Sequence, residues 1–152
     1  MVVVRALTVD DLPLLAAFAC ARLDEPLTEV VQRDVRQHLA ADVTQGRLVA
    51  LGLFEDDGQL RGVAAYQRRS LSAGPIFRTE VVAVAVGGQR RGYGRMLKEA
   101  VISEARRAGA VAVDSRVHRA NTAMLQLNRA LGAVVADIDG EPDHVVCVIP
   151  LR

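Results

Sequence analysis

The chain has 152 residues, with 19 basic and 18 acidic side chains and a formal net charge of +1. This length is typical of one domain, and a hydrophobic content of 51% is enough for a buried core and excludes a disordered chain. The charge balance argues against a general nucleic-acid binder, because such proteins carry a clear basic excess.

The cysteines and the apolar runs bear on the cellular compartment. Cys20 and Cys147 lie far apart and form no C-x-x-C pair, so we expect buried free thiols. The apolar run at the N-terminus is too short for a signal peptide, and no segment reaches the ~20 apolar residues of a membrane-spanning helix. We therefore expect a cytoplasmic protein without a membrane or metal site. Lys98 is the only lysine.

The N-terminal part of the chain is predicted to form a strand and two helices. A strand over Val2 to Ala6 precedes Thr8, and Asp11 follows Thr8 at the spacing of a capping box. The helix that starts there should run to about Arg22. A second helix capped by Thr28 has an apolar face made of Val31, Val35 and Leu39.

A hairpin and a long central strand are expected next. Arg47 to Phe54 and Leu60 to Arg68 read as strands joined through the turn Asp57-Gly58. Arg69 to Pro75 is rich in Ser, Gly and Pro, which favours a loop. Ile76 to Val86 is the next strand, and its apolar residues at successive positions predict burial on both faces.

Helices and strands alternate in the C-terminal half. Apolar residues recur at helical spacing over Tyr93 to Ala108 and Asn121 to Leu131, and a glycine follows each segment. The remaining strands are predicted over Ala110 to Val117, Ala133 to Ile138 and Val145 to Leu151. No linker or repeat divides the chain, so we expect a single α+β domain over residues 1–152, built on a mixed sheet.

The segment VVAVAVGGQRRGYG, from Val81 to Gly94, joins a strand to a helix through a glycine-rich turn. Such a turn leaves N–H groups without partners, and the helix dipole adds positive potential, so the turn suits a phosphate group. It is not a Walker A loop, because Tyr93 and Gly94 stand where that loop has lysine and a hydroxyl. A dinucleotide fingerprint also fails, because its third glycine would fall at Leu97.

The pattern Q-x-x-G-x-G over Gln89 to Gly94 resembles the acyl-CoA loop of the GNAT superfamily of N-acetyltransferases. The segment from Asn121 to Gly132 is similar to the family's second conserved block. The resemblance covers nearly the whole chain and implies a mixed, mostly antiparallel central sheet flanked by helices, with strands splayed at the cofactor site. It also implies acetyl-CoA as the cofactor and direct attack by an amine in a ternary complex.

The resemblance assigns the pyrophosphate of the cofactor to the main-chain amides of the turn and the pantetheine arm to the end of the preceding strand. The N–H of Val84 would polarise the thioester carbonyl. Arginine side chains of the turn either add phosphate contacts or form a solvated basic surface. Asn121 can cap its helix and, by resemblance, also meets the cofactor. The expected cofactor contacts are Val84, Val86, Gln89, Arg90, Arg91, Gly92, Tyr93, Gly94, Arg95 and Asn121.

Three residues are the candidates for catalysis: Glu80, Val84 and Asn128. Glu80 can take the proton of the amine directly or through water, although a surface carboxylate on a strand is the alternative. Asn128 stands where many family members have a tyrosine that protonates the leaving thiolate. An amide donates a hydrogen bond but no proton, and a thiol of pKa near 8.5 can leave without full protonation. Tyr66, Ser115 or His118 are alternative acids.

Two functions therefore stay open. The first is an N-acetyltransferase that acts on a small-molecule amine, an amino acid or a peptide N-terminus. The second is a non-catalytic acyl-CoA-binding or sensing module, which the departure at Asn128 favours. Acetylation of RNA has little support from the near-neutral charge. His118 is either a second base or a loop histidine facing solvent, and His38 and His144 are expected to be structural. The final strand could pair across a homodimer.

Overall fold

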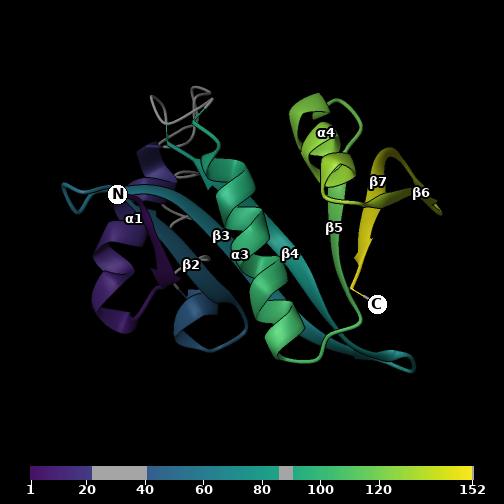
Figure 1. Ribbon diagram of the computed structural model, residues 1–152, viewed down its shortest axis with the longest axis horizontal. Helices are drawn as coiled ribbons and strands as arrows, with labels where there is room; N and C mark the ends of the chain where they lie inside the picture. The colour runs from purple at the N-terminus through teal and green to yellow at the C-terminus, as the bar shows by residue number, and fades with distance from the viewer. Residues whose placement is uncertain (22–40, 86–90, 152) are drawn as a thin grey trace. The chain divides into compact units, whose positions relative to one another are not determined.

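The computed structural model describes residues 1–21, 41–85 and 91–151 (Figure 1). Its strands form a seven-stranded sheet in the order β1-β2-β3-β4-β5-β7-β6. β4 pairs with β5 in parallel, whereas β1 with β2, β5 with β7 and β6 with β7 are antiparallel. The predicted α+β fold with a mixed sheet is confirmed. Two compact units make up the chain: Met1–Ala65 with Val81–Ala100, and Tyr66–Glu80 with Val101–Arg152.

The first unit contains the N-terminal strands and the start of the helix Tyr93–Arg107. Its elements are β1 (Val3–Ala6), the 3-10 turn η1 (Val9–Asp11), α1 (Leu12–Ala21), a helical stretch at 41–44, β2 (Val49–Phe54), and parts of β3 (Leu60–Leu71), β4 (Gly74–Val84) and α3 (Tyr93–Arg107). β1 pairs with β2 from Val3 opposite Phe54 to Ala6 opposite Leu51. Most of the second helix predicted from Thr28, including its apolar face, lies outside the described residues.

The capping box predicted at Thr8 is present. The Thr8 N–H donates to Oδ2 of Asp11 over 2.8 Å, and Arg5 donates to both oxygens of the same carboxylate over 2.8 and 3.0 Å. These hydrogen bonds hold the pKa of Asp11 well below its usual range. The bond from Arg5 has the largest effect, and that from Thr8 the next largest. The box begins the 3-10 turn η1, and α1 follows from Leu12.

Apolar side chains of α1, β3 and β4 form the core of this unit. The helix α3 approaches β3 closely, because a Cβ at Gly62 would lie 2.8 Å from Cδ1 of Leu97 and 3.3 Å from the carbonyl oxygen of Ala83. The single lysine, Lys98, is fully buried on α3. The buried members of the core are Leu15, Phe18, Val63 and Ala83, with Leu7, Leu12, Val43, Leu60, Val81 and Ala85 packed against them.

The second unit contains the C-terminal strands and α4. Its complete elements are β5 (Ala112–His118), α4 (Thr122–Ala130), β6 (Val134–Ile138) and β7 (Glu141–Pro150). β5 pairs with β7 from Ala112 opposite Pro150 to His118 opposite His144. Met124 and Leu125 of α4 pack on a small core formed by Val117, Val145 and Cys147. Cys147 is buried, as predicted, and the side chain of Cys20 lies outside the described part.

The loop predicted over Arg69 to Pro75 is wrong, because strand structure occupies most of it. β3 continues to Leu71 and β4 begins at Gly74, so only residues 72 and 73 form the turn. Gly74 has a φ of 132°, a backbone conformation that favours glycine. The carbonyl of Pro75 accepts from the Val111 N–H over 2.8 Å, which links the start of β4 to the residue before β5.

The last strand also differs from its prediction. β7 begins at Glu141 rather than at Val145, because Asp139-Gly140 is a tight turn and pairing with β6 resumes at once, with Ile138 opposite Glu141. The turn was recognised in the sequence, but the polar residues after it hid the start of the strand. Among the described residues, none of the helices has the length and apolar character needed to cross a membrane.

Candidate cofactor and catalytic site

The start of α3 exposes main-chain N–H groups. Gly92, directly before the helix, has a φ of 77°, and apart from its chain neighbours no atom of the described residues lies within 4 Å of a Cβ built on it. The first hydrogen bond of the helix runs from the Met96 N–H to the Gly92 carbonyl over 3.0 Å. The N–H groups of Tyr93, Gly94 and Arg95 precede it and therefore have no acceptor within the helix.

The charges at this helix start are the reverse of what helix stability favours. The first turn of α3 has no acidic residue; Arg91 precedes it and Arg95 lies within it. Arg95 Nε donates to Glu99 over 2.9 Å, and Nη1 of Arg91 lies 3.5 Å from a carboxylate oxygen of Glu55. Cations at a helix N-terminus oppose its dipole, so this arrangement suits an anionic ligand better than it suits the isolated helix.

Tyr93 is the aromatic residue of this turn, and two of its features concern the site. Tyr93 is buried, so its side chain is not available to a ligand from solvent. A hydrogen bond with Tyr93 is the largest cause that raises the pKa of Arg91, ahead of the charge of Glu55. Three further predicted contacts, Val86, Gln89 and Arg90, lie outside the described residues.

Val84 ends β4, and the orientation of its N–H follows from the next residue. The Ala85 N–H donates to the carbonyl of Arg61 on β3 over 2.8 Å. Successive N–H groups of an extended strand point to opposite edges. The N–H of Val84 therefore points to the edge of β4 that faces away from β3.

Glu80 belongs to the second unit and is exposed on β4. The pairing of β4 with β5 runs from Ile76 opposite Ala112 to Thr79 opposite Ser115, so Glu80 directly follows the last residue of this register. Its carboxylate accepts a hydrogen bond from Nε2 of Gln67. The pKa of Arg78, two residues earlier, is raised by its hydrogen bonds to Asp114 and, to a smaller extent, by the charge of Glu80.

Asn128 is fully buried in α4, and among the described residues neither its side-chain oxygen nor its nitrogen has a hydrogen-bond partner. Its main-chain carbonyl accepts from the N–H groups of Leu131 and Ala133 over 3.1 and 2.9 Å, at the end of the helix. Buried side-chain amides in proteins are nearly always paired with protein, water or ligand.

Asn121, directly before α4, is exposed and caps this helix as predicted. Its side-chain oxygen accepts from the Met124 N–H over 3.2 Å. The predicted residues are thus divided between the two units. The first unit holds Val84 and the described part of the glycine turn, and the second holds Glu80, Asn121 and Asn128.

The alternative acids have different environments. Tyr66 is buried and stacked on Phe77 with ring centroids 4.6 Å apart, and burial raises its pKa, which makes it a weaker acid at neutral pH. Ser115 is also buried. His118 is exposed, and its Nδ1 accepts from the Ala120 N–H over 3.0 Å.

The structure joins two histidines that the sequence analysis treated separately. The rings of His118 and His144 meet edge to face with centroids 4.9 Å apart, because the two residues are opposite each other in β5 and β7. Only the register of β5 against β7 brings this pair together, and no short sequence pattern indicates that register. No group of three potential metal ligands occurs among the residues that the structure describes.

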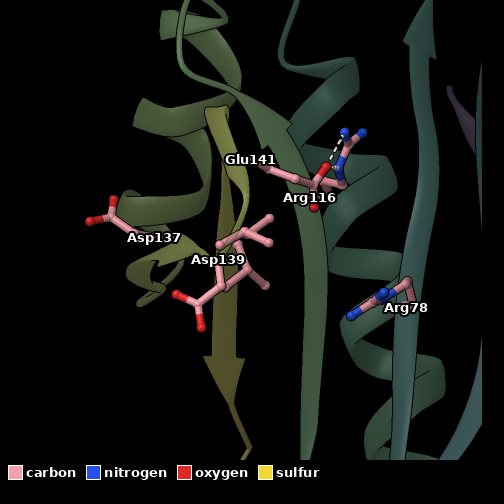
Figure 2. A pocket seen from close by; sticks show the side chains of 7 residues that line it. Arg78, Arg116, Asp137, Asp139 and Glu141 are labelled. Atoms are coloured by element: carbon pink, nitrogen blue, oxygen red, sulfur yellow. Dashed lines mark hydrogen bonds and ion pairs between the residues drawn. The ribbon is translucent and has the colours of Figure 1, made fainter.

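A pocket of about 370 Å³ lies on the second unit, and Figure 2 shows its charged rim. Most of that charge is already neutralised within the protein. Arg78 donates to both oxygens of Asp114 over 3.1 and 2.7 Å, and Arg116 pairs with Glu141. None of the predicted site residues lines the pocket, which is formed by Arg78, Arg116, Asp137, Ile138, Asp139, Glu141 and Val146.

The fold is that of the acetyltransferase structures to which the chain is similar. The model of the acetyltransferase (GNAT) family matches residues 14–133, and the chain belongs to this family. No curated protein matches the sequence. Acetyl-CoA is the cofactor of this family, in agreement with the cofactor predicted from the glycine turn.

Solved structures of acetyltransferases share the fold over almost their whole length. The PaiA N-acetyltransferase from Thermoplasma acidophilum, in complex with coenzyme A, has a TM-score of 0.77 at 16% identity, with 99% of each chain covered. The ribosomal-protein-S18-alanine N-acetyltransferase from Escherichia coli has a TM-score of 0.77 at 21% identity, covering 100% of this chain and 95% of that one. The ribosomal-protein-alanine N-acetyltransferase from Brucella melitensis has 0.68 at 23%, with 96% of each chain covered.

Proposed function

We propose that the protein is an N-acetyltransferase that moves the acetyl group of acetyl-CoA to a primary amine by direct attack in a ternary complex. The observation that carries this proposal is the start of α3. It combines an open glycine of positive φ, N–H groups without intrahelical acceptors, and a first turn without an acid. Each of these features favours a phosphate group at that helix end.

The turn from Gln89 to Arg95 would hold the pyrophosphate mainly through its main chain. The two arginine side chains that the structure describes there, Arg91 and Arg95, each have a carboxylate neighbour. Their net contribution to an anion is therefore reduced, while the N–H groups and the helix dipole keep their full effect. Asn121, at the start of α4, is the further side chain that we assign to cofactor binding.

Val84 is proposed to stabilise the oxyanion. Acetyl-CoA supplies an activated acyl group whose carbonyl oxygen becomes negative when an amine attacks. The N–H of Val84 is directed away from β3, which supports its availability to such an oxygen. A fixed main-chain donor of this kind stabilises developing charge without reorganisation.

Glu80 is proposed to accept the proton of the amine, directly or through water. Alkyl amines are mostly protonated at neutral pH, and only the neutral form attacks a carbonyl. The carboxylate of Glu80 is exposed and accepts a hydrogen bond from Gln67, so it is held in place and still open to solvent. These are suitable conditions for a base that must release its proton afterwards.

Asn128 is proposed to donate a hydrogen bond to the departing thiolate. Its Nδ2 is buried and unpartnered, which supports a role toward a ligand. Because an amide cannot give up a proton in this pH range, the thiolate would leave as an anion and take its proton from water. A thiol pKa near 8.5 makes this exit feasible.

The acceptor is proposed to be a small amine, an amino acid or a peptide N-terminus. The protein itself is proposed to be cytoplasmic and to consist of a single domain. Two of the similar structures are ribosomal-protein-alanine N-acetyltransferases, which supports a protein or peptide N-terminus within this group. A thiol-release assay with acetyl-CoA and an amine panel that includes alanine-terminated peptides tests the activity. Binding of coenzyme A in calorimetry without turnover on any amine would instead favour the sensing module.

The role of Glu80 is tested with Glu80→Gln. We expect kcat/KM to fall about a hundredfold at neutral pH, and the deficit to shrink at high pH, where the amine loses its proton to solvent. Glu104→Gln is the matched control, because Glu104 forms an exposed helical pair with Arg107 and has no assigned role. A loss that is equal at all pH values, or no loss, would exclude Glu80 as the base.

A further inference from the structure

One row of buried side chains crosses three strands of the second unit on a single face of the sheet. Thr79 is opposite Ser115 in the pairing of β4 with β5, and Ser115 is opposite Cys147 in the pairing of β5 with β7. Residues paired in this way project to the same face of a sheet. Thr79 and Ser115 are also the last pair of the β4–β5 register, so the row lies at the end of that ladder.

The helix α4 covers the face that carries this row. Met124 and Leu125 pack on the small core that contains Cys147. Asn128 follows these two residues by four and three positions, which places it on the same side of the helix. Because Asn128 is also fully buried, its amide lies between the helix and the sheet face that carries Thr79.

Two polar side chains on this face have no hydrogen-bond partner among the described residues. They are Thr79, through its hydroxyl Oγ1, and Asn128, through both polar atoms of its amide. Thr79 is 5% exposed and Asn128 is 0% exposed, so bulk water does not satisfy them. Ser115, the neighbour of Thr79 in the row, makes an interaction of its own. Two orphaned buried groups, one from a strand and one from the helix that covers it, indicate a site for a small polar group.

The surroundings of Thr79 on its own face are largely apolar. Phe77, two residues earlier on that face, stacks on Tyr66 with ring centroids 4.6 Å apart. Burial is the main cause that raises the pKa of Tyr66, and Glu104 and Arg107 of α3 contribute smaller effects. A hydrogen bond in such surroundings is stronger than one in water. The charged residues next to the row project to the opposite face, since side chains alternate along a strand; they are Arg78, Glu80, Asp114 and Arg116.

We propose that Thr79 and Asn128 form the subsite for the thiol end of coenzyme A, with the Thr79 hydroxyl as a catalytic hydrogen-bond donor. This inference rests on the proposed function, because it takes coenzyme A to be the leaving group. When the tetrahedral intermediate collapses, the C–S bond breaks, the carbonyl forms again, and the sulfur leaves with the electron pair as a thiolate. The Thr79 O–H and the Asn128 N–H donate to this anion, and water then supplies its proton.

A structural water between the two groups is the alternative, and it predicts a different response. Such a water would support the fold equally with any ligand bound. A thiolate subsite acts only on a ligand that carries negative charge on sulfur. The two are therefore separated by ligands that differ at the sulfur alone.

The test is the affinity of coenzyme A for Thr79→Val, measured by calorimetry beside desulfo-coenzyme A, which lacks the sulfur. If the subsite stabilises the thiolate, only coenzyme A binds more tightly to the unaltered protein as the pH rises toward the thiol pKa near 8.5. Valine keeps the shape of threonine without its hydroxyl. We expect coenzyme A to bind about tenfold more weakly to Thr79→Val at high pH and less than about twofold more weakly at pH below about 7, as for the loss of one hydrogen bond to a charged group.

Turnover gives a second readout. The kcat of Thr79→Val should fall by up to about tenfold, while the dissociation constant of acetyl-CoA stays unchanged, because the thioester sulfur carries no charge before the C–S bond breaks. Thr79→Ser is the matched control that keeps the hydroxyl, and it should restore most of both effects. The desulfo ligand meets the same protein groups, including the Cys147 thiol, and so corrects for their titration.

Several outcomes would overturn the subsite. Equal weakening of both ligands at every pH would show a structural role, and unchanged binding and turnover in Thr79→Val would exclude the hydroxyl. Loss of the pH-dependent gain in Ser115→Ala instead would assign the donor to Ser115. The same pH dependence for both ligands in the unaltered protein would refute the subsite alone, whereas absence of coenzyme A binding would refute the proposed function itself.

Discussion

The helices α3 and α4 start in opposite ways. α4 begins with Asn121, whose side-chain oxygen accepts the Met124 N–H, so the helix satisfies its own first turn. α3 begins after Gly92, which has no side chain to accept a hydrogen bond, and the residues around its first turn are basic rather than acidic. The first start favours the isolated helix, and the second favours a helix with an anion bound.

This difference shows how a ligand site can be recognised from local chemistry. A helix start that lacks both a cap and an acid is left less stable than it could be. Such local inconsistencies tend to concentrate at functional sites, where a ligand supplies the missing interaction. The contrast between α3 and α4 can therefore be tested by giving each start the chemistry of the other.

The largest effect is expected from Gly92→Asp. An aspartate tolerates a positive φ and gives α3 the acid that its first turn lacks, but it sets a negative charge beside the pyrophosphate. We expect coenzyme A affinity to fall by about 3 kcal/mol, roughly a hundredfold, with the fold retained. Calorimetry measures the affinity. Gly92→Asn is the uncharged control, and an equal loss in both variants would point to backbone strain instead of charge.

Asn128→Leu is expected to have a smaller effect, in which stability rises and activity falls. α4 is satisfied at its start but not in its last turn, where the buried Asn128 amide has no partner among the described residues. Leucine has the same number and branching of side-chain heavy atoms and no polar group to bury. The free energy of unfolding should rise by about 2 kcal/mol without ligand, while kcat falls. Thermal melting and the thiol-release assay check the two parts.

Loss of stability together with loss of activity in Asn128→Leu would contradict this reading of the residue. It would mean that the side chain packs as a necessary part of the core. A gain in stability with unchanged turnover would instead separate Asn128 from the leaving thiolate.

The smallest effect is expected from Asn121→Ala, which removes the cap of α4. The unfolding free energy should fall by about 1 kcal/mol, the usual contribution of such a cap. Asn121→Ser is the control that keeps a cap and loses the amide. If Asn121 also meets the cofactor, both variants weaken coenzyme A binding, but only the alanine variant melts earlier. Equal affinity in all three proteins would restrict Asn121 to capping.

Features that depend on a few neighbouring residues were predicted well from the sequence. The capping box at Thr8, the cap at Asn121 and the turns at Asp57-Gly58 and Asp139-Gly140 each follow from side-chain chemistry over two to four positions. The glycine turn was also recognised locally. The positive φ of Gly92 is what its pattern implied, whereas Gly94 lies inside the first turn of α3.

Features that depend on strand register were not accessible in the same way. The contact between Glu55 and Arg91 joins a hairpin to a turn far along the chain, and the His118–His144 pair needs the exact opposition of β5 and β7. The burial of Asn128 had a signal, since it falls on the same helical face as Met124, but its lack of partners did not. Pairing at a distance is decided by packing, which no short pattern encodes.

The buried state of Lys98 has a practical consequence for work on this acetyltransferase. Because the chain's only lysine is fully enclosed in α3, the folded surface presents no lysine amine to reagents. Amine-directed labels and cross-linkers would react with lysines of an added protein and not with Lys98 of this chain. In a mixture, acetyl-lysine detected on folded material therefore reports on the acceptor, free of background from self-modification.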